Sequence, residues 1–244
     1  MCYNIFMERD LVYILGYGVD SFSFDSAVDY IFEKHGQIIT INPEMIKCAD
    51  KNQEFKHIID NADMVVPDGI GVQLGLKILG HNINRIPGID LGKALLKRAS
   101  YLKKTVALIG AEQDVVENAV VNLKFDMPEL NIVYYTNGYF SDDEHVISEI
   151  ISKKPDLILS ALGSPKQEFF NYKLKTLLPE SITIGLGGSF DVWAGNVKRA
   201  PKILRNLGLE WLYRTVCEPQ RLKRIFPTLP LFIIKVLKER LLKK

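Results

Sequence analysis

Asp156–Glu168, with the sequence DLILSALGSPKQE, carries the pattern that decides the fold. Its first part, Asp156–Leu162, is a short apolar run typical of a buried strand. Gly163 then permits a close backbone approach, and Pro165 suits the first turn of a helix, from which Gln167 can point at a ligand. A strand that passes through a glycine turn into a helix is the unit of an α/β sheet. A plain strand-to-helix connection fits the segment equally well, so its function stays open on local sequence alone.

The same alternation runs along most of the chain. Further strand-like apolar runs lie at Leu11–Leu15, Gln37–Ile41, Met64–Val66, Thr105–Ile109, Asn131–Tyr135 and Ile182–Leu186. Helical spacing is clearest in Glu112–Phe125 and in Asp142–Lys153, which opens with acids where the helix dipole favours them. We therefore predict a Rossmann-like α/β fold, with a largely parallel sheet flanked by helices. In such sheets ligands bind beyond the carboxyl ends of the strands.

Charge divides the chain into two parts. Residues 198–244 carry 13 Lys or Arg against 3 Asp or Glu, a net charge of +10, whereas residues 1–197 carry a net charge of −8. Strand signals stop near residue 200, and the remainder is basic, apolar and helical, punctuated by Pro219, Pro227 and Pro230. We predict an α/β catalytic domain over 1–200 and a basic amphipathic helical appendage over 201–244. This polarity indicates an anionic partner for the appendage, which membrane, phosphate or nucleic acid could supply.

The appendage mixes apolar and basic residues in a way that suits a helix lying in a bilayer interface. Its apolar members are Leu229, Leu231, Phe232, Ile233, Val236, Leu237, Leu241 and Leu242. A helix packed on the core with a basic outer face is the competing interpretation. Few aromatic residues interleave with the arginines, which argues against binding of single-stranded nucleic acid, and we expect no nucleic-acid partner. No run reaches the ~20 apolar residues of a transmembrane helix, and the start does not resemble a secretory signal, so we expect a cytoplasmic protein.

Two predicted strand ends carry candidate catalytic groups. Asp68, in Pro67-Asp-Gly69, is either a helix N-cap, the commoner role, or a general base held at the carboxyl end of a strand. Thr40 and Asn42 lie on one side of the preceding strand by alternation, and both can hydrogen-bond a sugar. Asn42 fits equally well as the cap of the following helix.

Glycine turns and an arginine are candidate anion contacts. The run Gly185-Leu-Gly-Gly188 lets backbone N–H groups approach phosphate at Gly185, Gly187 and Gly188, although a tight turn explains it as well. It is not the dinucleotide fingerprint GxGxxG, whose absence after the first strand argues against a nicotinamide-dependent oxidoreductase. Arg85, before the Pro87-Gly88 turn, is either solvated or faces a phosphate. No Asp-x-Asp, His or Cys set with metal-ligand spacing occurs, so we expect no metal and no cofactor.

Taken in order, these motifs resemble one known family. They are Thr40-x-Asn42, Pro67-Asp-Gly69, Arg85 with Pro87-Gly88, Gly163-Ser-Pro-Lys-Gln-Glu168, Gly185-x-Gly-Gly-Ser-Phe-Asp191, Gly195-x-x-x-Arg-Ala-Pro201 and Gly208-Leu-Glu-Trp211. Any one of them is weak evidence, but the ordered set is specific and spans nearly the whole chain. It resembles the WecG/TagA/CpsF glycosyltransferases, and most closely their TagA-like branch.

The resemblance implies metal-independent, inverting transfer of a sugar from a UDP-sugar donor to an undecaprenyl-diphosphate-linked acceptor. In the TagA-like branch N-acetylmannosamine passes to lipid-linked N-acetylglucosamine in teichoic acid synthesis. Alternatives within the family are capsular or exopolysaccharide glucosyl-, galactosyl- and N-acetylmannosaminuronosyltransferases. Such a protein is peripheral on the inner face of the cell membrane and meets an anionic membrane surface through its tail. A homo-oligomer stays open.

The resemblance also implies roles for individual residues. Asp68 is the catalytic base, while Thr40, Asn42 and Gln167 line the sugar pocket with Arg85 nearby. Three arginines belong to an appendage that closes over the site and meets the lipid diphosphate; they are Arg214, Arg221 and Arg224. Without a metal, the charge of the leaving UDP must be met by arginines and by backbone N–H groups.

Overall fold

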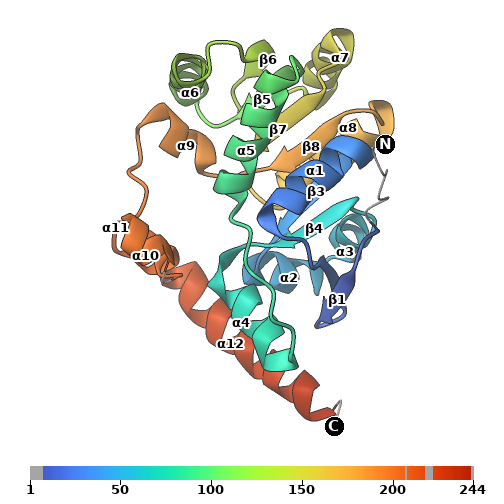
Figure 1. The fold of residues 1–244 in the computed structure, drawn as a ribbon, viewed down its shortest axis with the longest axis vertical. Helices are drawn as coiled ribbons and strands as arrows, with labels where there is room; N and C mark the ends of the chain where they lie inside the picture. The colour runs from blue at the N-terminus through green and yellow to red at the C-terminus, as the bar shows by residue number, and fades with distance from the viewer. Residues whose placement is uncertain (1–7, 207, 218–221, 243–244) are drawn as a thin grey trace, which may run out of the picture.

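The computed structural model describes residues 8–206, 208–217 and 222–242 (Figure 1). Within them, six strands form one sheet in the order β4-β3-β8-β7-β5-β6, with every neighbouring pair parallel. The strands are β3 (Gly36–Ile41), β4 (Met64–Pro67), β5 (Thr105–Gly110), β6 (Asn131–Thr136), β7 (Leu157–Ala161) and β8 (Ile182–Gly185). The predicted Rossmann-like α/β fold is therefore confirmed.

Helices cover both faces of this sheet and bury its strands from both sides, apart from the partly exposed edge strand β6. One face is covered by α1 (Phe24–Lys34), α5 (Gly88–Tyr101), α6 (Gln113–Asp126) and α9 (Ser189–Ala194). The other is covered by α2 (Pro43–Ala49), α3 (Gln53–Asp60), α4 (Gly69–Leu79), α7 (Asp143–Lys153) and α8 (Lys166–Leu177). Successive residues of β3 serve the two cores in turn, since Ile38 packs into the first and Ile39 into the second.

The first predicted strand forms, but outside the parallel sheet. β1 (Leu11–Ile14) pairs antiparallel with β2 (Tyr17–Asp20), a strand that the sequence patterns did not predict. Gly and Asp are uncommon in strands, so strand propensity does not predict β2. Asp20 holds it in place, because its carboxylate forms an ion pair with Arg9 and accepts the Val65 N–H at 2.7 Å. The hairpin therefore extends the molecule beside β4.

The chain after residue 200 is helical, as predicted, in α10 (Lys202–Asn206), α11 (Glu210–Cys217) and α12 (Leu222–Leu242). α12 continues through two of the prolines noted in the sequence, Pro227 and Pro230, whereas Pro219 lies outside the described residues. α12 runs along α4 (Figure 1) and buries Phe232 and Val236 in the same core as β1 and β3. The core-packing interpretation therefore holds for one face of this helix. None of the described helices is both long and apolar enough to span a bilayer.

Candidate active site

A cavity of about 790 Å³ lies beyond the carboxyl ends of β3, β4, β7 and β8. Four segments far apart in the sequence meet there, because parallel strands end at the same edge of the sheet. The predicted residues that line it are Thr40, Asn42, Asp68, Gln167, Gly185, Gly187 and Gly188. The strand-end motifs thus come together in one site.

Asp68 stands between β4 and α4, with its backbone N–H bonded to the Ile41 carbonyl at 2.9 Å. It occupies the N-cap position of α4, but its carboxylate makes no capping hydrogen bond to the helix. The α-carbon of Gly88 lies beside this carboxylate, since a Cβ built there would be 3.5 Å from Asp68 Oδ2. The half-buried carboxylate is therefore part of the cavity wall, where it can take a proton from a bound hydroxyl.

Asn42 does cap a helix. Its Oδ1 accepts the backbone N–H groups of Glu44 and Met45, each at 3.0 Å, at the start of α2. The capping interpretation is confirmed, and the side-chain nitrogen is left as the group that can donate to a ligand. Thr40, two residues earlier on β3, is almost fully buried and also lines the cavity. The two residues share one side of the strand, as alternation predicted.

Gln167, in the first turn of α8, has both ends of its carboxamide held. Oε1 accepts the Gly187 N–H at 3.2 Å, and Nε2 donates to Glu168 Oε1 at 2.8 Å. Gly185 makes room for this group, because a Cβ there would lie 2.5 Å from Gln167 Nε2. The Gly187 N–H, predicted as a phosphate contact, is therefore used by Gln167 instead.

Two arginines of the predicted motifs bind protein groups. The Arg85 guanidinium donates to the Arg205 carbonyl in α10, and Arg85 is not among the residues that line the cavity. Arg199 pairs with both carboxylate oxygens of Asp90, at 2.5 and 2.6 Å, and reaches Glu210 of α11 at 3.3 Å. These contacts fasten α10 and α11 to the start of α5.

The appendage also contributes to the cavity wall. Trp211 of α11 lines it together with Thr228 and Leu229 of α12, and none of these three residues was predicted to belong to the site. Of the three, only Trp211 belongs to one of the ordered family motifs, Gly208-Leu-Glu-Trp211, and that motif was the one sequence signal that pointed to it. Arg221 lies outside the described residues, as do the side chains of Arg214 and Arg224, so the roles of these arginines stay predictions.

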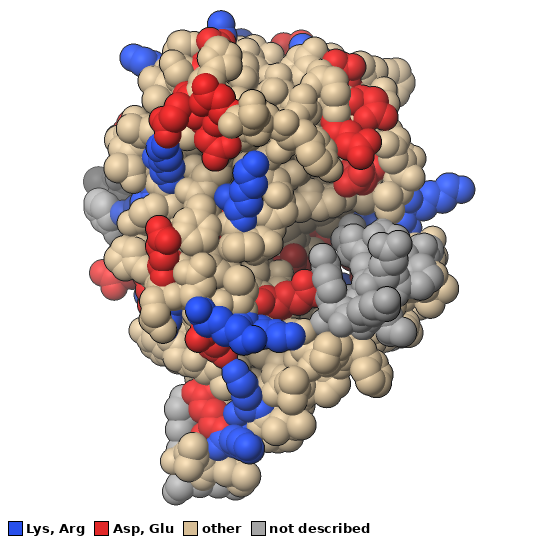
Figure 2. Space-filling view, turned by 180° about the vertical axis from the view of Figure 1, so that it is seen from behind, with Lys and Arg blue, Asp and Glu red and all other residues tan. Residues whose placement is uncertain are grey.

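The described wall of the cavity is acidic. Its charged members are Glu44, Asp68, Glu112 and Asp191, and no described Lys or Arg lines it. Figure 2 shows acidic side chains in the hollow on this face of the molecule. Nowhere in the described part of the chain do three His, Cys, Asp or Glu side chains gather so as to hold a metal ion. The described wall therefore offers an anionic ligand no cationic side chain.

Comparison with known proteins gives two kinds of match. Residues 12–244 match the model of the Glycosyl transferase WecG/TagA/CpsF family. A protein of Bacillus spizizenii named N-acetylglucosaminyldiphosphoundecaprenol N-acetyl-beta-D-mannosaminyltransferase is 40% identical over 202 residues, which cover 82% of this chain and 78% of the relative. A Bacillus subtilis protein of the same name is 39% identical over 217 residues, covering 88% of this chain and 84% of the relative.

Proposed function

Because the chain belongs to the Glycosyl transferase WecG/TagA/CpsF family, as its ordered motifs indicated, we propose that it transfers N-acetylmannosamine to N-acetylglucosaminyl-diphosphoundecaprenol. Both relatives are named for this reaction. One structural observation carries the proposal: residues from four separate motifs line a single cavity at the carboxyl edge of the sheet. The donor is UDP-N-acetylmannosamine, and the product enters teichoic acid or another cell-surface polysaccharide.

Asp68 acts as the general base in this mechanism. The acceptor hydroxyl attacks the anomeric carbon of the donor sugar, the bond from that carbon to UDP breaks, and the hydroxyl proton passes to the Asp68 carboxylate. A single displacement of this kind inverts the anomeric centre. The proposal is supported by the position of the carboxylate, which lines the cavity and makes no capping hydrogen bond to α4. Thr40, Asn42 and Gln167 hydrogen-bond the sugar from the same wall.

The departing UDP needs cationic groups, because its charge grows as the bond breaks. The described wall supplies carboxylates instead, so the positive charge must come from the basic part of the chain, residues 198–244. We assign this role to Arg214, Arg221 and Arg224. No metal or other cofactor takes part.

α12 binds the membrane surface through the face that it turns away from α4. Leu231, Ile234, Leu237 and Leu241 share that face at helical spacing and are between 46% and 71% exposed. Lys238 lies among them, which suits an interface with anionic lipid headgroups. The same helix contributes Leu229 to the cavity wall, so docking brings the cavity next to the lipid diphosphate. The protein thus works peripherally, at the inner face of the cell membrane.

A panel of UDP-sugars with lipid-linked N-acetylglucosamine, analysed by mass spectrometry, tests the proposed function. We expect one N-acetylhexosamine to be added from UDP-N-acetylmannosamine, with UDP released in equal amount. UDP-glucose, UDP-galactose and UDP-N-acetylmannosaminuronic acid are the competing donors. Exclusive use of one of them would replace the proposed donor, and no transfer from any of them would overturn the function.

A further inference from the structure

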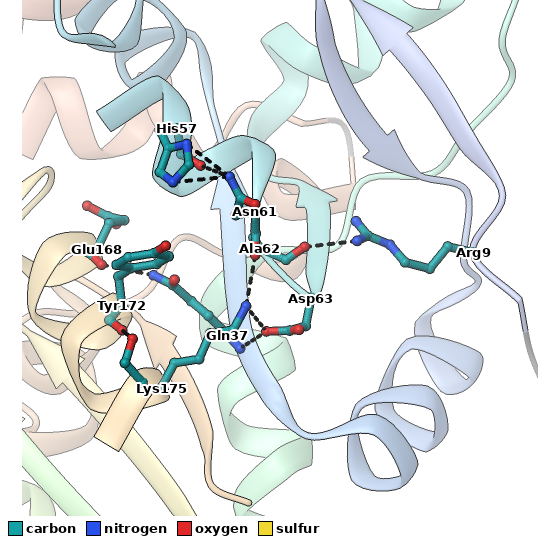
Figure 3. Close-up of polar contacts among 10 residues, drawn as sticks. Arg9, Gln37, His57, Asn61, Ala62, Asp63, Glu168, Tyr172 and Lys175 are labelled. Atoms are coloured by element: carbon teal, nitrogen blue, oxygen red, sulfur yellow. Dashed lines mark hydrogen bonds and ion pairs between the residues drawn. The ribbon is translucent and has the colours of Figure 1, made fainter. Parts of the chain in front are cut away.

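A layer of buried polar side chains lies between α8 and the sheet, behind the cavity. Gln37 on β3 and Thr183 on β8 are paired in the strand register, so they lie side by side on the sheet. Glu168 and Asn171 come from α8, one helical turn apart. Gln37 Nε2 bridges the two elements by donating to the Glu168 backbone carbonyl at 2.9 Å (Figure 3). All four side chains are at most 3% exposed.

This layer is only partly hydrogen-bonded. Among the described residues, Gln37 Oε1, Glu168 Oε2, Thr183 Oγ1 and both amide atoms of Asn171 have no hydrogen-bond partner. A half-satisfied buried network is less stable than an apolar core of the same shape. Packing alone therefore does not account for a carboxyl group at position 168, whereas its contact with Gln167 gives it a role.

Glu168 contacts the cavity through Gln167. The Gly187 N–H can only donate, so Gln167 must turn its oxygen to Gly187 and its nitrogen to Glu168. The nitrogen carries two hydrogens, and one of them is used by Glu168. The other is available to an acceptor atom of a ligand in the cavity that Gln167 lines.

This arrangement does not depend on the charge of Glu168. Burial raises the pKa of the Glu168 carboxyl, and hydrogen bonds from Gln167 and Ser164 oppose that rise. A protonated carboxyl keeps one oxygen that can accept from Gln167, as an ionised one does.

We propose that Glu168 is a positioning residue, which holds the Gln167 carboxamide so that its second Nε2 hydrogen faces an acceptor oxygen of the donor sugar. The oxygen is a hydroxyl or an acetamido carbonyl, the groups of an N-acetylated sugar that accept from an amide. The inference rests on the proposed function, in which Gln167 contacts the sugar.

A double-mutant cycle on kcat/KM for the sugar donor tests this coupling. Glu168→Met, and Glu168→Ala as a smaller replacement, remove the acceptor, and each should lower kcat/KM about tenfold, the loss expected for one hydrogen bond to a carboxyl group. In a Gln167→Ala background the same changes should have no further effect. Glu168→Gln keeps an acceptor oxygen, so this variant should retain most of the wild-type kcat/KM. Additive losses would overturn the proposal.

Asn171→Leu is the matched control, because Asn171 shares the buried layer and has no hydrogen bond to Gln167. It should leave kcat/KM unchanged while thermal melting reports on the fold. The side-chain amide signal of Gln167 in ¹⁵N-glutamine-labelled protein, identified by its loss in Gln167→Ala, gives a readout that needs no turnover. Glu168→Met or Glu168→Ala should shift it, and Asn171→Leu should not. A wild-type protein that transfers no sugar would refute the proposed function, whereas an unmoved amide signal would refute the role of Glu168.

Discussion

The phenyl ring of Phe232 packs over Gly75, where α12 runs along α4 and a larger residue at position 75 would not fit. A Cβ built on Gly75 would lie 3.1 Å from Phe232 Cε1 and 2.6 Å from Ile14 Cδ1. One turn earlier on α4, a Cβ on Gly71 would lie 2.8 Å from Leu229 Cδ1. These two glycines form a shallow groove for α12. Packing in this groove, together with hydrogen bonds such as that from the Leu15 N–H to Glu239, joins the C-terminal helix to the core.

Gly75→Val should displace α12. The added side chain meets Ile14 and Phe232 in a packed region, and overpacking of this kind costs ~1–3 kcal/mol of the free energy of unfolding. Thermal melting should show the loss, and sugar transfer should fall with it because α12 lines the cavity. Leu74→Val is the control, since Leu74 is exposed on the same helix. Equal melting temperatures for Gly75→Val and wild type would mean that α12 is not held by this groove.

Asp68→Asn should lower turnover by ~10²–10⁴-fold, the contribution of a general base. The affinity for UDP, measured by calorimetry, should stay close to that of wild type, because the amide occupies the same space. The start of α4 should also persist, since the Asp68 side chain makes no capping hydrogen bond to that helix. Asn42→Ala gives the contrast, because loss of the cap on α2 costs ~1 kcal/mol of stability. Wild-type rates in Asp68→Asn would remove the base from the mechanism.

The sheet could be predicted from sequence because its strands are short, mainly apolar runs, and all of them except the edge strand β6 are largely buried. The hairpin could not, since Tyr17–Asp20 contains Gly and Asp and depends on the ion pair of Asp20 with Arg9. The ligand edge followed from topology alone. The sequence could not predict which of the two side chains caps its helix, because Asp68 and Asn42 both precede helices and both suit an N-cap. Only the three-dimensional arrangement separates them: Asn42 caps α2, and Asp68 does not cap α4.

The C-terminal helix marks the other limit of sequence reasoning. Phe232 and Val236 are buried, while Leu231 and Ile234 between and beside them are about half exposed. All four are apolar, so periodicity cannot tell which side of the helix faces the core. The choice is made by the glycines of α4, whose missing side chains accept Phe232 and not its neighbours. Such complementarity between distant segments is not visible in either segment alone.

Chelation should leave sugar transfer unchanged. The carboxylates that line the cavity are not among any set of three or more ligands that could hold a metal in the described part of the chain. Activity would be measured after EDTA treatment and again after Mg²⁺ or Mn²⁺ is added back. A loss that either ion reverses would reveal a metal site and would transfer the stabilisation of UDP from arginine to that ion.

The exposed face of α12 should control membrane binding. Leu231→Glu combined with Leu237→Glu places two charges where apolar burial in the headgroup region is expected, and leaves the buried Phe232 untouched. Sedimentation with anionic liposomes should show binding at least ~10-fold weaker, because burying one such side chain contributes ~1.5–3 kcal/mol. Phe125, on α6, is 85% exposed, so Phe125→Glu is the control for a general loss of apolar surface.

Lys238→Glu should weaken binding mainly at low salt, where charge attraction to the lipids is least screened. The double variant should keep transferring sugar to a short-chain soluble acceptor while losing turnover with acceptor embedded in a bilayer. If it pellets with liposomes as the wild type does, α12 is a packing helix and the protein reaches its lipid acceptor by another surface.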